Sequence, residues 1–465
     1  MTIKKKQPGL AEKYNVPAPR YTSYPTMPYW DTNAFSQAEW KLSVKRSCAE
    51  SNATEGISLY VHLPFCESLC TYCGCNTRIT KNHGVEMPYI LAVLKEWQMY
   101  RSILGEKPVI RELHLGGGTP TFFSAENLHL LIYGLLEGAD IHPQAEFSFE
   151  AHPANTTVKH LQTLYDLGFR RLSLGIQDFD PTVQFIINRH QTVEQVQFVT
   201  DEARRIGYKS INYDLIYGLP LQTIDGLTNT IHRVAELMPD RIAFYSYAHV
   251  PWVKPGQRKF TEADLPDVNE KIRLYEIGRC LLKSYGYIDI GMDHFAMPGD
   301  TLCLAEHTGR LHRNFMGYTD NHTRLLIGLG VSAISDSWYA FAQNVKVVEE
   351  YISLVNNSTE LAGERMLPVF KGHILTRDDL IIRRHILNIM CKGETGWDRP
   401  EEQCDAIFDA LDRLQPLADD GLITLYLSGL KVTAKGKRYL RNICMALDAR
   451  LWADKPATQL FSMAV

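Results

Sequence analysis

Short apolar, β-rich runs recur through the middle of the chain and constrain its fold more than any other feature. They read VIRELHL (109–115), EFSFE (146–150), RLSLGI (171–176), INYDLIYG (211–218), RIAFYSY (241–247) and YIDIGM (287–292). Helical patterns lie between several of them, such as 124–138 and 192–207, and the second ends at Gly207 as at a C-cap. This alternation predicts parallel βαβ units. We therefore expect an α/β fold, with a partial or closed (βα) barrel.

The pattern changes on both sides of this region. We predict an N-terminal arm over residues 1–52, a barrel over 53–345 and a mainly helical C-terminal domain over 346–465. The last of these includes a hairpin turning at Ser428–Gly429. Helices followed by a two-stranded wing with clustered lysines and arginines also occur in DNA-binding domains. No base-reading side chains stand in the first helix, so a cap over the barrel is the favoured interpretation.

Composition narrows the functional classes. The 465 residues carry a formal net charge of −4, which gives no electrostatic footprint for nucleic acid. The start, MTIKKKQPGL, lacks the apolar core of a secretory signal, and no apolar run approaches the roughly 18 residues of a membrane span. Outside one loop the cysteines show no disulfide spacing. We expect a cytoplasmic protein that binds neither nucleic acid nor membrane.

That loop, FCESLCTYCGC (65–75), contains four of the ten cysteines. Cys66, Cys70 and Cys73 are spaced C-x3-C-x2-C, and thiolates favour zinc or iron–sulfur clusters. A structural zinc site usually has four ligands in two knuckles, and no second knuckle follows. A redox C-x-x-C pair would leave Cys66 without a role. Three thiolates suit a four-iron cluster with one open iron, with a zinc loop as the alternative.

Polar and glycine residues follow the predicted strands at their carboxyl ends, where barrel enzymes place their chemistry. The cysteine loop itself follows a predicted strand at Ile57–Leu63. The segment GGGTPT (116–121) follows the next strand, and its glycines would let the backbone approach a carboxylate. Glu150, Gln177 and Asp214 occupy later strand ends. Helix capping and loop hydrogen bonds are the alternative roles for these residues.

The cysteine spacing with Tyr72 before the third cysteine resembles that of the radical S-adenosylmethionine (SAM) enzymes. In that family three cysteines hold a [4Fe–4S] cluster, and SAM chelates the fourth iron. Nearly the whole chain is similar to the oxygen-independent coproporphyrinogen III oxidases. The similar segments are PRYTSYPT (19–26), YVHLPFCESLCTYCGC (60–75), LHLGGGTPT (113–121), LSLGIQDFD (172–180), DLIYGLP (214–220), YAHVP (247–251), GMDHFA (291–296), LHRNFMGYT (311–319) and GLGVSAIS (328–335). RYTSYPT and the Gly74–Cys75 pair are the most discriminating features.

The resemblance implies residue roles. Cys66, Cys70 and Cys73 would be the cluster ligands, and Cys75 would not be a ligand. Two SAM molecules are expected. The site of the cluster-bound SAM would be lined by Tyr60, Gly117, Glu150 and Ile334. The second SAM would contact Tyr72, Gly118, Thr119, Gln177, Arg189, Asp214 and Ala248. Tyr60 and Glu150 are also the predicted catalytic residues.

The resemblance also implies a reaction: two propionates of coproporphyrinogen III become vinyl groups, giving protoporphyrinogen IX in haem biosynthesis. No amino-acid base removes hydrogen from an unactivated carbon, so a cofactor radical is required. An electron donor such as flavodoxin or ferredoxin, an unidentified acceptor and a monomeric chain are expected. Arg20 and Tyr21 could contact substrate carboxylates or the second SAM, or belong to an arm that only packs over the barrel mouth.

Two positions depart from the family pattern, Met316 before Gly317 and Asp320 after Thr319, and they bear on substrate choice. The rival interpretations are a radical SAM paralogue acting on haem or another tetrapyrrole, and a haem-binding chaperone that keeps a cluster.

Overall fold

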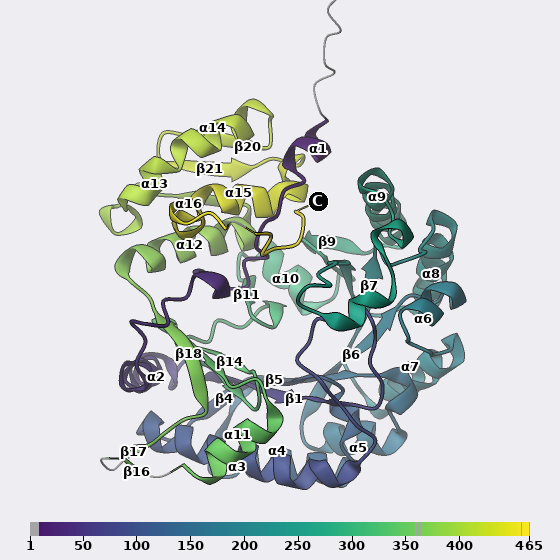
Figure 1. Cartoon of the computed structure of the whole chain (residues 1–465), viewed down its shortest axis with the longest axis vertical. Coiled ribbons are helices and arrows are strands. Elements are labelled where there is room, and N and C mark those ends of the chain that lie inside the picture. The colour runs from purple at the N-terminus through teal and green to yellow at the C-terminus, as the bar shows by residue number, and fades with distance from the viewer. Residues whose placement is uncertain (1–8, 359, 362–363, 457, 465) are drawn as a thin grey trace, which may run out of the picture.

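Parallel strands form the centre of an open twelve-stranded sheet in this computed structural model, which describes residues 9–358, 360–361, 364–456 and 458–464 (Figure 1). In spatial order the parallel strands are β13 (Leu326–Leu329), β1 (Ile57–Leu63), β4 (Val109–Gly117), β5 (Asp140–Ala151), β6 (Phe169–Gln177), β7 (Ser210–Tyr217) and β8 (Arg241–Ser246). Antiparallel strands extend both edges: β14 (Ile334–Asp336), β15 (Ala340–Asn344) and β18 (Val369–Ile374) on one side, β10 (His294–Ala296) and β9 (Ile288–Gly291) on the other. All six predicted runs form strands, but the last of them, β9, pairs antiparallel with β10 and so lies outside the predicted parallel units. The barrel is partial, because β18 and β9 end the sheet without pairing.

Helices cover the outer face of the parallel strands (Figure 1). They include α3 (Glu86–Leu104), α4 (Ala125–Leu136), α5 (Val158–Asp166), α7 (Val193–Ile206), α8 (Ile224–Leu237) and α9 (Val268–Ser284). Helix α7 shows why the sequence pattern was informative. It begins at a reciprocal cap between Thr192 and Gln195 and ends at Gly207, whose φ is 116°.

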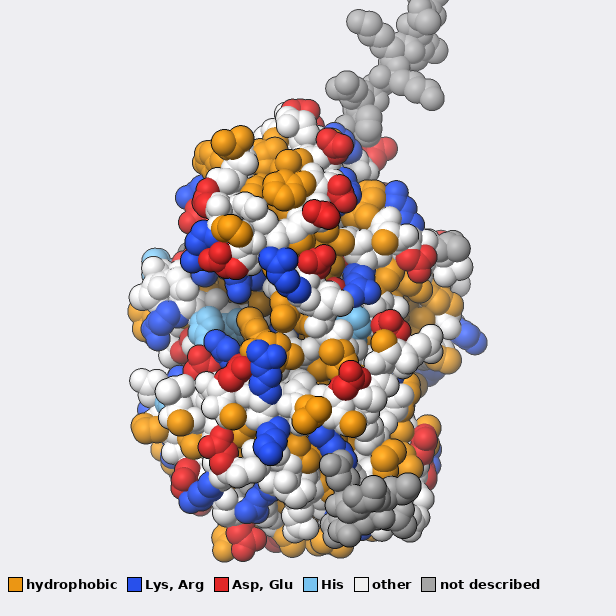
Figure 2. All heavy atoms as spheres, turned by 90° about the vertical axis from the view of Figure 1, so that its left-hand side faces the viewer, with side chains coloured by type: hydrophobic (Ala, Val, Ile, Leu, Met, Phe, Trp, Pro, Cys, Tyr) orange, Lys and Arg blue, Asp and Glu red, His pale blue; other side chains and the backbone are white. Residues whose placement is uncertain are grey.

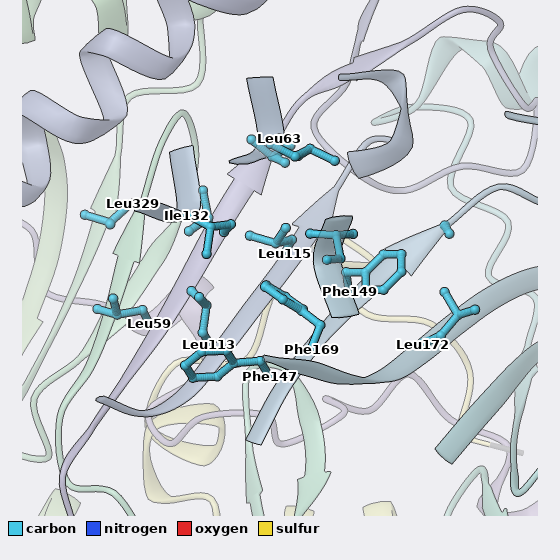
Figure 3. Packing of buried hydrophobic residues seen from close by; sticks show 14 of the residues in the cluster. Leu59, Leu63, Leu113, Leu115, Ile132, Phe147, Phe149, Phe169, Leu172 and Leu329 are labelled. Atoms are coloured by element: carbon cyan, nitrogen blue, oxygen red, sulfur yellow. The ribbon is translucent and has the colours of Figure 1, made fainter. Parts of the chain in front are cut away.

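The core between sheet and helices consists of the apolar side chains on alternate positions of the strands. Figure 3 shows Leu113 and Leu115 of β4, Phe147 and Phe149 of β5, and Ile132 of α4 packed together. Because the helices bury this outer face, the polar alternate positions face the inside of the sheet. That inner surface carries the candidate site.

The C-terminal part is mainly helical, as predicted. It contains α12 (Arg377–Lys392), α13 (Asp405–Asp409), α14 (Leu411–Asp419) and α15 (Leu440–Leu447), with a small sheet of β19 (Glu394–Gly396), β21 (Gly429–Val432) and β20 (Ile423–Tyr426). The predicted hairpin exists, but its turn was placed one residue too late. Tyr426 pairs with Gly429, so the turn is Leu427–Ser428. Gly429 belongs to strand β21 and pairs with Gly396 of β19. The two backbones are so close that a Cβ on Gly429 would be 2.7 Å from the Thr395 carbonyl oxygen, so only glycine fits there.

The predicted division at residues 52 and 345 stays a prediction. The large sheet takes β18 from beyond residue 345, and Tyr21 and Tyr24 of the arm pack in a hydrophobic cluster with Ile386 and Leu440. Figure 2 shows the side that carries helix α2 (Gln37–Ser51) and β18, where basic and acidic side chains are interspersed. No helix in the described ranges is long and apolar enough to cross a membrane.

Candidate active site

The cysteine loop leaves β1 at Pro64 and folds over the carboxyl end of the sheet. Its first turn is fixed by a short parallel pair, β2 (Phe65–Cys66) with β3 (Arg78–Ile79), in which Cys66 faces Ile79. Cys66, Cys70 and Cys73 are free thiols that line one cavity of about 480 Å³. The structure therefore brings together the three cysteines that the sequence selected.

The surroundings of these thiols fit a thiolate-held cluster. The Thr119 hydroxyl lies 3.3 Å from Cys66 Sγ, and Arg189 Nη1 lies 3.8 Å from Cys70 Sγ. The Cys75 backbone N–H donates to Cys73 Sγ at 3.4 Å, and hydrogen bonding by Cys75 lowers the pKa of the Cys73 thiol to about 6. Thiolate is the form that binds iron. Within the described ranges no three His, Cys, Asp or Glu side chains converge tightly enough for a single metal ion.

The glycine segment at the end of β4 lies directly against this loop. The Gly118 N–H donates to the Leu63 carbonyl at 2.8 Å. A Cβ on Gly118 would be 2.7 Å from the Pro64 carbonyl carbon, and one on Gly117, whose φ is 114°, would be 2.8 Å from the His62 ring. Only glycine permits this approach, so Gly117, Gly118 and the following Thr119 all line the cavity.

Glu150, at the end of β5, extends into the cavity with 44% of its side chain exposed there. Burial would raise the pKa of its carboxyl, but His114, at 3.6 Å, and the Gly117 N–H, at 3.2 Å, more than offset this, so the pKa is lowered. Tyr60 stacks on His114 with ring centres 5.9 Å apart, and its hydroxyl lies 3.1 Å from His62 Nδ1. Tyr60 thus supports His114; it is not among the residues that line the cavity, so its contact with SAM stays a prediction.

Asp214 lies within β7, which is separated from β5 by β6. Its carboxylate accepts hydrogen bonds from the Ser173 hydroxyl at 3.0 Å and the Asn212 amide at 2.9 Å. Burial, and then the charge of Glu150, raise the pKa of Asp214 to about 6. The two carboxylates line the same cavity, and their environments drive their pKa values apart.

Gln177 and Arg189 also line the cavity. Gln177 ends β6 with a φ of 66°, an uncommon backbone conformation that aims its side chain back over the strand. The buried Arg189 guanidinium donates to the Gly175 carbonyl and to Gln191 Oε1 as well as facing Cys70. A side chain at Gly175 would collide with both Gln177 and Arg189.

The remaining predicted residues lie at the margin. Tyr72 lines the cavity, and the Gln257 amide donates to the carbonyls of both Tyr72 and Ala248 at 3.2 Å, which makes them neighbours. Ile334 packs against Gly328, which pairs with Tyr60. Ala248 and Ile334 are not among the residues that line the cavity.

Sequence reasoning missed several residues that hold the site together: His62, His114, Ser173, Asn212 and Tyr245. A second, interior cavity of about 210 Å³ adjoins the first. Four residues line both cavities: Glu150, Ser173, Asp214 and Tyr245. Met316 lines this interior cavity and Asp320 does not.

Of the two arm residues, Arg20 donates to the Ser246 carbonyl at 2.9 Å. Tyr21 is 2% exposed and donates to Asp448, so it does not face either cavity.

An open parallel barrel with three free thiols at the strand ends defines a radical SAM protein, and residues 60–234 match the family model of the radical SAM superfamily. Its cofactors are a [4Fe–4S] cluster and SAM.

The chain belongs to the oxygen-independent coproporphyrinogen III oxidases. It is 39% identical over 462 residues to the protein of that name from Escherichia coli K12, covering 98% of both chains, and 36% identical over 466 residues to that from Synechocystis, covering 98% of this chain and 97% of the other. The solved structure of the coproporphyrinogen III oxidase HemN from Escherichia coli, described as a radical SAM enzyme, superposes with a TM-score of 0.85 at 38% identity, over 92% of this chain and 97% of that one.

Proposed function

We propose that this protein converts two propionates of coproporphyrinogen III into vinyl groups without oxygen, giving protoporphyrinogen IX for haem biosynthesis. The observation that carries the proposal is the single cavity that joins the three thiols, the glycine segment and the two carboxylates. Its relatives over nearly the whole chain are named for this activity. When bound and reduced, the cluster together with SAM supplies a 5′-deoxyadenosyl radical, which can remove a hydrogen atom from the propionate β-carbon.

The residues of the chain hold and orient the reactants. Cys66, Cys70 and Cys73 are the proposed cluster ligands. Ionised Glu150 accepts hydrogen bonds from the ammonium or ribose of the cluster-bound SAM, whose site Tyr60, Gly117 and Ile334 complete. Tyr60 and Glu150 are catalytic in the sense that they contact this cofactor.

A second SAM molecule is proposed beside the first. Asp214, which accepts hydrogen bonds from Ser173 and Asn212, would also accept hydrogen bonds from the ribose hydroxyls of this second SAM. The Arg189 guanidinium would bind the carboxylate of the same molecule. The other contacts are Tyr72, Gly118, Thr119, Gln177 and Ala248. Binding of both molecules in one cavity would hold the reacting groups close together.

We further propose a monomeric, cytoplasmic enzyme. An electron donor such as flavodoxin or ferredoxin would supply the reducing electron, and a separate acceptor would take the electron that the substrate must lose.

The test is an anaerobic incubation of the reconstituted protein with reductant, SAM and coproporphyrinogen III, with and without an electron acceptor. We expect carbon dioxide, protoporphyrinogen IX, at least one SAM consumed per decarboxylation, and a higher vinyl yield with the acceptor. Cleaved SAM with all four propionates intact would contradict the proposed substrate. Stoichiometric haem binding without turnover would instead favour a chaperone.

A further inference from the structure

A third cavity, of about 50 Å³, lies where the N-terminal arm, helix α9 and the C-terminal part meet, and basic side chains dominate its lining. Lys437 is exposed and lines it, so the cavity is open to solvent on that side. None of its charged residues lines either cavity of the active site. These charged residues are five basic side chains and one acidic side chain: Arg20, Lys271, Lys437, Arg438, Arg441 and Asp293.

The acidic groups of this region neutralise only part of the positive charge. Arg438 forms an ion pair with Glu276 of α9 at 2.7 Å. Asp293 lies 3.7 Å from Arg20, which is long for an ion pair. The other three basic side chains of the cavity form no ion pair within the described residues. The lining therefore carries a net positive charge.

Lys271, in the first turn of α9, is the basic group best placed to bind a ligand. One of its N–H groups donates to the Tyr247 carbonyl at 3.0 Å, and an ammonium group has three donors. Burial, and then the positive charges of Arg20 and Arg441, lower the pKa of Lys271 to about 8, and Asp293 offsets only part of this. At pH 7 Lys271 is therefore a partly buried cation that lacks a counter-charge.

Arg441, in α15, adds charge to the cavity while its own donors are already used. It is 7% exposed and donates to the carbonyls of Pro19 at 3.1 Å and Met463 at 2.7 Å. Carbonyl groups satisfy hydrogen bonds without cancelling a full charge. Arg441 thus ties the arm to the C-terminal tail and leaves a positive charge beside Lys271.

The size of the cavity fits one small anion. A single water needs about 10–15 Å³ of cavity, so roughly four waters, or one group of three or four oxygens, can be accommodated. Hydrogen bonds from ammonium and guanidinium groups to an ionised oxygen are about twice as strong as neutral ones. A phosphate or a carboxylate supplies the missing counter-charge.

We propose that this cavity is an oxyanion-binding site that joins the arm, helix α9 and the C-terminal part. Lys271 and Lys437 donate to the bound oxygens, and Arg20 approaches them from the arm. Arg20 also donates to the Ser246 carbonyl and lies 5.9 Å from the ring centre of Tyr245, which lines both cavities of the active site. A bound oxyanion therefore holds the arm in place beside the active site.

The first test is thermal unfolding of the anaerobic, cluster-loaded protein in inorganic phosphate or in chloride of equal ionic strength. Phosphate should raise the unfolding midpoint of the wild type more than chloride does. Lys271→Gln should weaken the apparent phosphate affinity about ten- to a hundredfold, because one charge-assisted contact is lost, and Lys437→Gln should weaken it less. Lys283→Gln, which removes an exposed lysine in the last turn of the same helix, is the matched control and should respond like the wild type. Phosphate also stabilises proteins nonspecifically, so the difference between wild type and variant is the quantity to compare.

A second test uses the unaltered chain and so does not depend on the folding of a variant. An amine-reactive acetyl ester is added at pH 8, where a large share of Lys271 is neutral and reactive. Peptide mass spectrometry then gives the acetylation rate of each lysine. Phosphate should slow the acetylation of Lys271 severalfold and leave that of Lys283 unchanged.

The same measurement distinguishes two sources of the oxyanion. Coproporphyrin III carries four carboxylates and its tetra-amide carries none. Protection of Lys271 by the acid and not by the amide would show that the site takes a carboxylate of the tetrapyrrole. Protection by phosphate alone would show that it takes a free anion.

The inference is overturned if neither phosphate nor coproporphyrin III protects Lys271. It is also overturned if wild type and Lys271→Gln show the same dependence on phosphate. Failure of the proposed function is distinct, because the wild type would then leave coproporphyrinogen III unreacted while phosphate still protected Lys271.

Discussion

Gly117→Ala should disable the site by a steric effect that the structure allows to be worked out. At a φ of 114° any side chain is strained, which costs about 1–3 kcal/mol. The added Cβ would lie 2.8 Å from two atoms of the His62 ring. That ring cannot turn away without breaking a contact, because it lies 3.1 Å from the Tyr60 hydroxyl and 2.8 Å from the Asn76 carbonyl oxygen. Overpacking of this kind costs about another 1–3 kcal/mol, for a sum of roughly 2–6 kcal/mol.

The assay is thermal unfolding together with SAM cleavage by the cluster-loaded protein. Gly117→Ala should lower the unfolding midpoint and abolish most SAM cleavage, because the bond from the Gly117 N–H to Glu150 is also displaced. Gly74→Ala is the matched control: it lies in the cysteine loop, has no positive φ, and a Cβ there would meet nothing within 4 Å. Its stability and SAM cleavage should match the wild type. Normal stability and SAM use in Gly117→Ala would refute the close-approach argument.

Two further predictions concern the cluster and the carboxylates. Cys73→Ala should lose the cluster absorbance at about 400 nm and with it SAM cleavage, whereas Cys75→Ser should keep about four iron per chain; cluster loss in Cys75→Ser would contradict three-thiolate binding. Asp214→Asn should weaken SAM use about ten- to a hundredfold with an unchanged cluster spectrum. Because the Asp214 pKa is about 6, the carboxylate is ionised above that pH and becomes neutral below it. SAM use by the wild type should therefore fall between pH 7 and 5, and the variant should lack this step; equal SAM use in both proteins across that range would assign Asp214 a structural role.

The sequence predicted the parallel strands and the helices between them because both signals are local. The apolar run of β6 and the cap at Gly207 are each contained within a few residues. The predicted hairpin turn is one residue too late because Gly429 is held in its strand by pairing with β19. Strand β19 lies more than thirty residues earlier in the chain, so the residues around the turn do not reveal this pairing.

The candidate site was predictable only in part. The cysteines stand in one loop with a recognisable spacing, and Glu150 and Asp214 lie in the second halves of strands β5 and β7. His114 and Asn212, which hold those carboxylates, stand two or more positions before the strand ends, at alternate positions that face inward. Side chains alternate between the two faces of a strand, and this alternation is visible in the sequence, so it predicts that both residues face inward. The contact between Gly117 and the His62 ring could not be found in this way, because it depends on the pairing of β1 with β4 in the folded sheet.

The most direct test of the central claim follows one hydrogen atom. Coproporphyrinogen III with deuterium at the propionate β-carbons is incubated anaerobically with the cluster-loaded protein, reductant and SAM, and the 5′-deoxyadenosine is analysed by mass spectrometry. We predict deuterium in 5′-deoxyadenosine together with the formation of vinyl groups, because the β-carbon donates the hydrogen atom. Unlabelled 5′-deoxyadenosine alongside a tetrapyrrole that keeps its four propionates would contradict the account.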